Sequence, residues 1–473
     1  AARLEGVRLD RARLDGARLV LIDPVHHKTA SLCEAYVQPA PGGDFALAMA
    51  VAHEIFARGW CDPEAASYCD HLEAFESLAR SRTVGAWCAL ADVPVTAAED
   101  LARRLAREGP TAILVGWGMG RRLNGSAIVR AIDALAAISG NLGVPGGGVS
   151  FYFKRRRAFD THWTEPSAPP PRTVCEPLFG REVLTLRDPP VRAVWITAGN
   201  PVAMLPESNT TVRALESREF VVVVDSFLTD TARLAHLVLP AVTLLESDDL
   251  VGAYGHHFLG VSRPVVDRPA EVRSDLEIMQ GLAALVGLTD VMAGTAREWK
   301  QRFVAGKLAA RGVTLEDLER GPVRNPLAAR VLYADRRFPT ATGRVNLMHE
   351  APAHLRSPRD GEFPLTLLSL STEKSQSSQW PRAPEGPATC TVHPDASGGI
   401  AHGALAKLES CIASVTVRVL HDPAQRRDVA IVPKGGHLRA GRCANALVRA
   451  QLTDDGEGGA LYDEPVRLRP VER

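Results

Sequence analysis

The sequence lacks a closely spaced cysteine pair: its eight cysteines are scattered over 473 residues, and none stands in a Cys-x-x-Cys motif. Such pairs usually hold iron–sulfur clusters and structural zinc ions, so there is no local signature for either. No run approaches the roughly 18 uninterrupted apolar residues of a membrane-spanning helix. The 55 basic residues equal the 55 acidic ones, whereas proteins that bind nucleic acid usually have a basic excess. We therefore expect no nucleic-acid partner and no direct membrane span.

Two further absences concern nucleotide-binding motifs. The glycine-rich turn over residues 116–120 is followed by Arg121, where the fingerprint Gly-x-Gly-x-x-Gly has its last glycine. No Gly-Lys-Ser or Gly-Lys-Thr phosphate loop occurs. These absences argue against a simple nicotinamide dehydrogenase and against a nucleotide hydrolase.

The chain also lacks an initiator methionine and a signal peptide. It begins at Ala1, and a helix-like run over residues 1–14 leads almost directly into an apolar strand. We interpret this abrupt opening as that of a fragment of a longer protein, and it indicates no localisation.

The first third alternates strands and helices, which is typical of a parallel sheet with helical crossovers. We expect strands over residues 18–22 and 111–115 and helices over 45–58, 96–107 and 127–139. Asp44 and Thr96 stand at the N-cap positions of two of these helices, and Glu99 would complete a capping box with Thr96.

A second α/β block and a β-rich end follow. Strands are expected over residues 193–197, 220–224 and 237–239, and the first two lack polar alternation, which predicts burial on both faces. Later β-like runs between Gly, Pro and Asp turns cover residues 365–370, 405–409, 414–420, 428–432 and 466–468. We thus predict an α/β domain over 1–155, a linker over 156–172, a second α/β domain over 173–335 and a β domain over 336–473.

Polar or glycine-rich turns follow the predicted strands at Asp23, residues 116–120, residues 199–201 and Asp225. In open α/β sheets, ligands bind outside the carboxyl ends of the strands, where helix N-termini and backbone amides gather. Two such blocks indicate one long phosphate-bearing ligand, or two of them. The alternative is that each turn is an ordinary strand-to-helix connection, in which Gly, Asp and Asn are common.

Several motifs recur in a fixed order along the chain: Leu21-Ile22-Asp23-Pro24, Pro41-Gly42-Gly43-Asp44, residues 140–148, Gly199-Asn200-Pro201, Val223-Val224-Asp225, residues 338–344, residues 376–380 and residues 392–403. Together they resemble the large molybdopterin oxidoreductases, the family of dimethyl sulfoxide reductase, formate dehydrogenase and periplasmic nitrate reductase. Any one motif is weak alone, but the resemblance runs in order across almost the whole chain.

The resemblance implies two parallel-sheet dinucleotide-binding domains followed by a carboxyl-terminal β-barrel of the double-psi type. It also implies a molybdenum or tungsten ion held by two pyranopterin guanine dinucleotides. The cofactor-binding residues it implies are Asp23, Gly43, Asp44, Trp117 and Arg121 for one dinucleotide, Asn200, Asp225 and Asp275 for the other, and Gln376, Ser377, Gln379 and Asn445 from the β domain. Carboxylates suit the amino and imino donors of guanine, while amides and hydroxyls suit pterin and phosphate groups.

In the family, the iron–sulfur cysteines and the metal-ligating residue precede the part that is matched here. The resemblance therefore implies that a [4Fe-4S] cluster and the metal ligand belong to a missing amino-terminal part, and that these 473 residues alone are inactive. Cys33 falls in a predicted helix and is not expected to bind the metal. We expect the adjacent His26 and His27 to form a polar turn, because neighbouring side chains diverge.

The function implied is two-electron or oxygen-atom transfer on a small-molecule substrate, with an electron-transfer partner subunit. Two alternatives stay open: a non-redox hydratase or transhydroxylase with the same cofactor, and a non-catalytic scaffold subunit related to the family. A scaffold would tend to lose the polar side chains that face the dinucleotides, whereas Asp23, Asp44, Asn200, Asp225 and Asn445 are present.

Overall fold

The computed structural model describes residues 16–150, 158–166, 168–252, 255–372, 377–379 and 385–471. The expected helix over residues 1–14 and the expected cofactor residue Gln376 lie outside the described residues. The fold is mixed α/β with parallel sheets and a closed barrel near the carboxyl end, which confirms the expected fold class. Across the described residues, no helix combines the length and apolar character needed to cross a bilayer.

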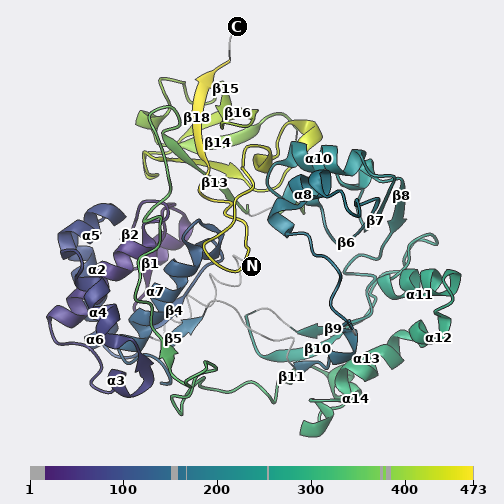
Figure 1. Cartoon of the computed structure of the whole chain (residues 1–473), viewed down its shortest axis with the longest axis horizontal. Helices are drawn as coiled ribbons and strands as arrows, with labels where there is room; N and C mark the ends of the chain where they lie inside the picture. Colours follow the sequence, from purple (N-terminus) through teal and green to yellow (C-terminus); the bar gives the residue numbers. More distant parts are fainter. Residues whose placement is uncertain are drawn as a thin grey trace.

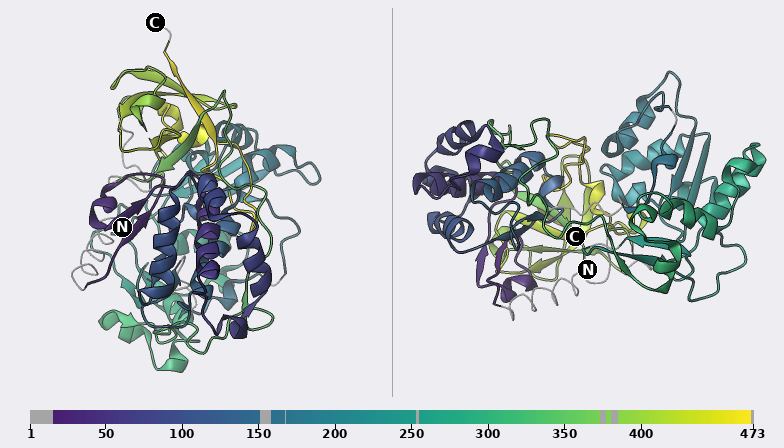
Figure 2. Two further views of the ribbon diagram at one scale, coloured as in Figure 1. Left: turned by 90° about the vertical axis from the view of Figure 1, so that its left-hand side faces the viewer. Right: turned by 90° about the horizontal axis from the view of Figure 1, so that it is seen from below.

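The two α/β regions lie on opposite sides of the molecule, and the barrel lies between and above them (Figures 1 and 2). In the first region, two pairs of short parallel strands accompany the short helix α3 (Ala65–Tyr68) and five longer helices. The strands are β1 (Val20–Ile22) with β2 (Ala35–Val37) and β4 (Ala112–Leu114) with β5 (Gly148–Ser150), and the helices are α2 (Asp44–Ala57), α4 (Leu72–Arg80), α5 (Val84–Ala91), α6 (Val95–Arg107) and α7 (Gly125–Ile138).

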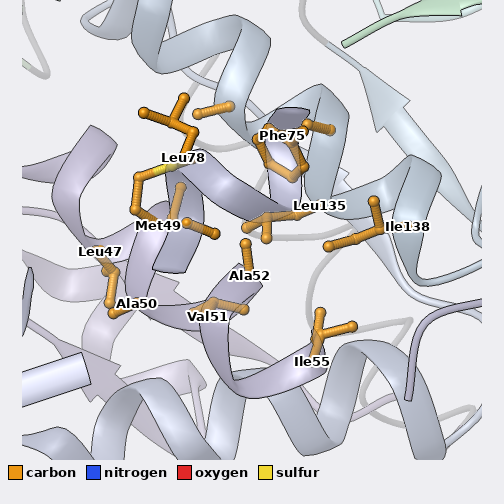
Figure 3. Packing of buried hydrophobic residues seen from close by; sticks show 14 of the residues in the cluster. Leu47, Met49, Ala50, Val51, Ala52, Ile55, Phe75, Leu78, Leu135 and Ile138 are labelled. Carbon is orange, nitrogen blue, oxygen red and sulfur yellow. The ribbon is translucent and has the colours of Figure 1, made fainter. Parts of the chain in front are cut away.

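Helix α2 is the centre of this region because apolar residues surround it on all sides, and a helix with that pattern must be buried. Figure 3 shows Met49 of α2 clustered with Phe75 and Leu78 of α4 and with Leu135 and Ile138 of α7. The packing fixes the position of α2, whose first residue is Asp44, one of the expected cofactor residues.

Two predicted helix caps are wrong. Helix α6 begins at Val95 with Pro94 as its N-cap, so Thr96 already has helical backbone and makes no capping hydrogen bond. Likewise Asp44 is the first helical residue of α2, and Gly43 is the N-cap. Cys33 does not lie in a helix: it is extended and follows the 3-10 helix η1 (Lys28–Leu32).

The second region contains the parallel sheet β6 (Ala193–Thr197), β7 (Phe220–Asp225) and β8 (Leu237–Pro240), in that order. Helices α8 (Phe179–Thr185), α9 (Pro201–Met204) and α10 (Ser208–Glu216) cover the face that Val221 and Val223 form. On the other face, Ile278 of α11 (Asp275–Leu285) packs against Val224. The prediction of burial on both faces is right for β7 but wrong for β6, because β6 is an edge strand whose Trp195 is 41% exposed.

An antiparallel sheet with three helices follows the second region. It contains β9 (Asp249–Gly252), β10 (Phe258–Ser262) and β11 (Val323–Arg324), with α12 (Thr289–Met292), α13 (Ala296–Val304) and α14 (Leu315–Arg320). The sequence did not indicate these strands, because they are short and separated by up to about 60 residues. The chain then returns to the first region, where β12 (Val345–Asn346) pairs in parallel with β3 (Cys69–Asp70).

Six strands close the barrel in the order β13-β17-β14-β16-β15-β18. They are β13 (Leu365–Leu370), β14 (Ala388–Val392), β15 (Leu405–Glu409), β16 (Ser414–His421), β17 (Val429–Pro433) and β18 (Pro465–Pro470). All but β14 were expected as strands. The pairs β13–β17 and β14–β16 are parallel, and the other pairs are antiparallel. The expected borders between the domains stay predictions.

Candidate functional site

The segment over residues 434–464, which joins β17 to β18, contacts both α/β regions. Asp454 accepts two backbone N–H groups of the first turn of α7, at 2.7 and 2.9 Å. The side-chain amide of Asn445 donates to the carbonyl oxygens of Ala203 and Met204, at 3.2 and 2.7 Å. This barrel segment therefore holds the two α/β regions in position, and Asn445 lies where the barrel meets the second region.

Asp44 lies at the start of α2 and is only 7% exposed. Its Oδ2 atom is buried and has no hydrogen-bond partner among the described residues. Burial raises the pKa of this carboxyl group to about 6, against the charge of Arg122, and the nearby carboxyl groups of Asp23 and Asp463 raise it further. The charges of Asp23, Arg122 and Asp463 thus all act on Asp44; the assignment of Asp23 and Asp44 to a cofactor stays a prediction.

Arg122 and Asp463 form a buried ion pair beside Asp44, with 3.0 Å between Nη1 and Oδ1. The same Nη1 donates to the carbonyl of Tyr462 at 2.9 Å and to the hydroxyl of Ser357 at 3.1 Å. Among the described residues Arg122 and Asp44 form no hydrogen bond, and the Nε atom of Arg122, like Oδ2 of Asp44, is buried without a partner. Sequence reasoning missed the pair; the one available signal was two adjacent acids, Asp463-Glu464, directly before an apolar strand.

The turn that leads into α2 requires glycine at position 42. Gly42 has a φ of +75°, and a Cβ atom there would lie 2.8 Å from the backbone nitrogen of Ser357. The carbonyl of Gly42 also accepts a hydrogen bond from Asn124, at 3.1 Å. The Pro-Gly-Gly-Asp motif therefore has a structural role, because Gly42 lets the backbone pack against Ser357. The same motif places Asp44 at the start of α2.

Trp117 and Arg121 belong to the turn between β4 and α7. Trp117 is largely exposed, and Arg121 ends the short helix η2 (Met119–Arg121). The carbonyl of Arg121 accepts the N–H of Tyr462 at 3.2 Å, which fixes this turn to the barrel segment. Burial, and then the charge of Arg121, lower the pKa of Lys434 to about 8. Lys434 was not among the predicted site residues.

Ser377 lies beside this lysine. It has a φ of +51°, and a Cβ atom at Gly435 would overlap its carbonyl group. Gln379 is exposed. The structure therefore places Ser377 against the loop that follows Lys434.

In the second region, Asn200 lies in the turn after β6, and Asp225 is the last residue of the neighbouring parallel strand β7, so both stand at strand ends as predicted. Asn200 is buried, and its Oδ1 accepts the hydroxyl of Thr231 at 2.7 Å. The Oδ1 of Asp225 accepts the N–H of Phe227 at 2.9 Å, and burial raises the pKa of this carboxyl group. Asp275 is exposed in the first turn of α11.

The described part of the chain contains no group of three or more His, Cys, Asp or Glu side chains placed to hold a metal ion. His26 and His27 lie in a turn: the N–H of His26 donates to Gln425 at 3.0 Å, and His27 accepts the N–H of Thr29 at 3.3 Å.

Residues 2–285 match the family model described as molybdopterin oxidoreductase. The chain belongs to the molybdopterin oxidoreductase family. It is 28% identical to "Probable oxidoreductase YyaE" of Bacillus subtilis, over 98% of this chain and 73% of that protein. It is 29% identical to the assimilatory nitrate reductase of Haloferax mediterranei, over 74% of this chain and 54% of the relative. Acetylene hydratase from Pelobacter acetylenicus has a similar fold, with a TM-score of 0.78 and 19% identity over 99% of this chain and 76% of that chain.

Membership in the molybdopterin oxidoreductase family identifies the protein as an enzyme of this family and implies a molybdopterin cofactor with molybdenum. The dimethyl sulfoxide/trimethylamine N-oxide reductase of Cereibacter sphaeroides, 28% identical, is matched over 58% of this chain and 38% of its own length. The relatives named here thus extend beyond the matched part.

Proposed function

We propose that this chain binds two molybdopterin guanine dinucleotides and belongs to a molybdenum or tungsten oxidoreductase that acts on a small substrate. The reaction class is two-electron or oxygen-atom transfer. The observation that carries the proposal is the carboxyl group of Asp44, which is buried with one oxygen left without a hydrogen bond.

A buried carboxylate oxygen without a donor is costly, so native proteins seldom keep one without a reason. A guanine base has adjacent imino and amino N–H donors, and a carboxylate can accept both. We assign Asp23 to the same base as a second acceptor, and its charge already acts on Asp44, whose pKa it raises. The donor set of guanine therefore fits this pair of residues.

For the second dinucleotide, we propose Asn200, Asp225 and Asp275, with Asn445 joining that region to the barrel. Asp225 fits because one carboxylate oxygen binds the N–H of Phe227 while the group as a whole is half-buried. When bound, the metal would supply the two-electron chemistry. The residues of this chain would hold and orient the dinucleotides and exclude water from them.

A redox enzyme is favoured over a hydratase because the relatives include reductases and a formate dehydrogenase subunit by name. Similarity to acetylene hydratase at 19% identity concerns the fold alone. A [4Fe-4S] cluster and an electron-transfer partner subunit are part of the proposal, and both would lie outside these 473 residues.

Metal analysis and acid release of GMP from the purified full-length protein test the proposal. We expect molybdenum or tungsten together with about two GMP per metal ion, and iron with acid-labile sulfide for the cluster. Absence of both metals, with no GMP released, would favour the scaffold alternative. A loaded protein that hydrates a substrate without consuming or producing electrons would instead establish the non-redox alternative.

A further inference from the structure

We propose that the outward face of α11 and α12 is an interface at which two copies of this chain associate. This inference does not depend on the proposed function. The face presents six large apolar side chains whose exposed fractions range from 37 to 86%, and we call them the α11–α12 patch. They are Met279, Leu282, Leu285, Val286, Leu288 and Val291. Both helices lie at the outer edge of the second region, away from the barrel (Figure 1).

The fold of the second region uses only the inward face of α11. Ile278 packs against Val224 of β7, and Ala283 is also buried. The outward side of a helix at the surface of a globular protein ordinarily carries polar and charged residues. In this chain, however, the stretch over residues 278–289 contains no charged residue. Packing within the second region therefore accounts for the inward residues of α11 but not for its apolar outward residues.

Hydrogen bonds hold the two helices of the patch in a fixed arrangement. The side-chain amide of Gln280 donates to the carbonyl oxygens of Met292 and Gly294, at 2.8 and 2.7 Å. The turn between the helices is closed by Leu288, whose N–H donates to the carbonyl of Ala283 at 2.8 Å. A surface that is rigid before association loses little conformational entropy when it docks. The α11–α12 patch is thus preorganised for association.

The area of the patch matches one side of a small dimer interface. If a fully exposed aliphatic side chain presents roughly 150 Å², the patch exposes about 500 Å² of apolar surface, a size that often marks a functional surface on a monomer. Two copies that meet through this patch would bury about 1,000 Å² in total, which is the lower bound for a specific interface. We therefore expect a reversible dimer that dissociates on dilution.

The composition of the patch favours a second copy over other occupants. Interfaces between identical chains are more apolar than the average protein surface, whereas interfaces between different proteins that associate transiently are not. A helix that lies on a membrane surface usually carries Lys or Arg beside its apolar face, but residues 275–292 contain neither. A two-fold interface brings the same patch of both copies together, so apolar side chains meet apolar side chains.

Sedimentation velocity of the purified full-length protein over about 0.1–100 μM tests the inference, because association depends on protein concentration. Leu285→Lys and Val291→Lys each place a charge in the patch, and both residues are exposed, so the core is not disturbed. The matched control is Leu332→Lys, which changes another exposed leucine. Leu332 precedes Tyr333, whose carbonyl packs against Gly143 in the first region. Hydrogen exchange at low and high protein concentration locates the surface that becomes covered.

We expect the wild type to form a dimer with a Kd in the micromolar range. Each substitution in the patch should weaken association by at least about 30-fold, because the charge enters the interface from both copies. Leu332→Lys should dimerise like the wild type. Hydrogen exchange over residues 279–291 should slow as the wild-type concentration rises. The GMP content should stay unchanged, because Leu285 lies about 15 Å along α11 from Asp275, the residue proposed for the dinucleotide.

A wild-type protein that stays monomeric at about 100 μM would overturn the inference. Dimers that survive both substitutions in the patch would also overturn it, because another surface would then join the copies. A monomer that binds phosphatidylcholine–phosphatidylglycerol vesicles or a co-purified subunit, and loses this binding in Leu285→Lys, would assign the patch to that occupant instead. A wild-type protein that dimerises as expected but releases no GMP would refute the proposed function and leave this inference standing.

Discussion

The substitution Asp44→Asn tests whether this carboxyl group is kept for a ligand or for the fold. Asparagine has nearly the same shape, so α2 should still begin at this position. Removing the charge also removes the cost of burying it. A residue that serves the fold should destabilise the protein when it is replaced, whereas one that serves a ligand often does the reverse.

The size of the effect follows from the pKa of Asp44. The ordinary value is 3.8, and burial raises it to about 6 in the folded protein. The pKa of Asp44 is higher in the folded state than in the unfolded state. The free energy of unfolding therefore falls as the pH rises from about 4 to 6, and above pH 6 this loss of stability is constant. At about 1.4 kcal/mol per pH unit, the charged form costs about 3 kcal/mol at pH 7.5 and about 0.5 kcal/mol at pH 4.

We therefore expect cofactor-free Asp44→Asn to be more stable than the wild type by up to about 3 kcal/mol at pH 7.5. The difference should nearly vanish at pH 4. Denaturant unfolding at four pH values between 4 and 7.5 measures it. In protein purified with its cofactor, the same substitution should lower the GMP content, since an amide nitrogen would then face the N–H donors of guanine.

The matched control is Asp317→Asn, which changes another helix-start aspartate. Asp317 accepts the N–H of Thr314 at 2.9 Å, and this bond and that from the Thr314 hydroxyl hold its pKa below the ordinary value. Replacing Asp317 by Asn should therefore lower the free energy of unfolding at neutral pH, whereas Asp44→Asn should raise it. If Asp44→Asn also destabilises the cofactor-free protein at pH 7.5, the carboxylate serves the fold through Arg122, and the reasoning that assigns it to guanine is refuted.

Three further substitutions have measurable outcomes. Asp225→Asn should weaken dinucleotide retention by roughly 30- to 1000-fold, or about 2–4 kcal/mol, while the melting temperature changes little; unchanged GMP content would mean that Asp225 only holds the N–H of Phe227. Asp463→Ala should cost about 3–5 kcal/mol of unfolding free energy, because it leaves Arg122 buried without its partner; a loss below 1 kcal/mol in urea unfolding would contradict this. Gly42→Ala should cost roughly 2–4 kcal/mol, because a Cβ atom meets the Ser357 backbone at a positive φ, and thermal melting checks it.

Local patterns predicted much of the fold because they depend on neighbours in the sequence. The strands β6, β13 and β15 have the predicted bounds. The ends of helices α2 and α7 lie within one or two residues of their predicted positions. The predicted caps failed because the helices began earlier than the pattern indicated: the N-cap of α6 is Pro94 instead of Thr96, and that of α2 is Gly43 instead of Asp44. Such an offset is decided by tertiary packing of the helix, which the capping pattern does not contain.

For the candidate site, the sequence by itself determined which polar residues follow strand ends: Asp23, Asn200 and Asp225 could be named because parallel strands place their carboxyl ends at one edge. Only the tertiary structure decided which residues meet there. Arg122 and Asp463 meet across more than 300 positions of the chain, and Arg121 acts on Lys434 across a similar separation. No local sequence pattern predicts these contacts. The burial of Asp44 and of Lys434, which shifts the pKa of each, arises only when the barrel packs against the α/β regions.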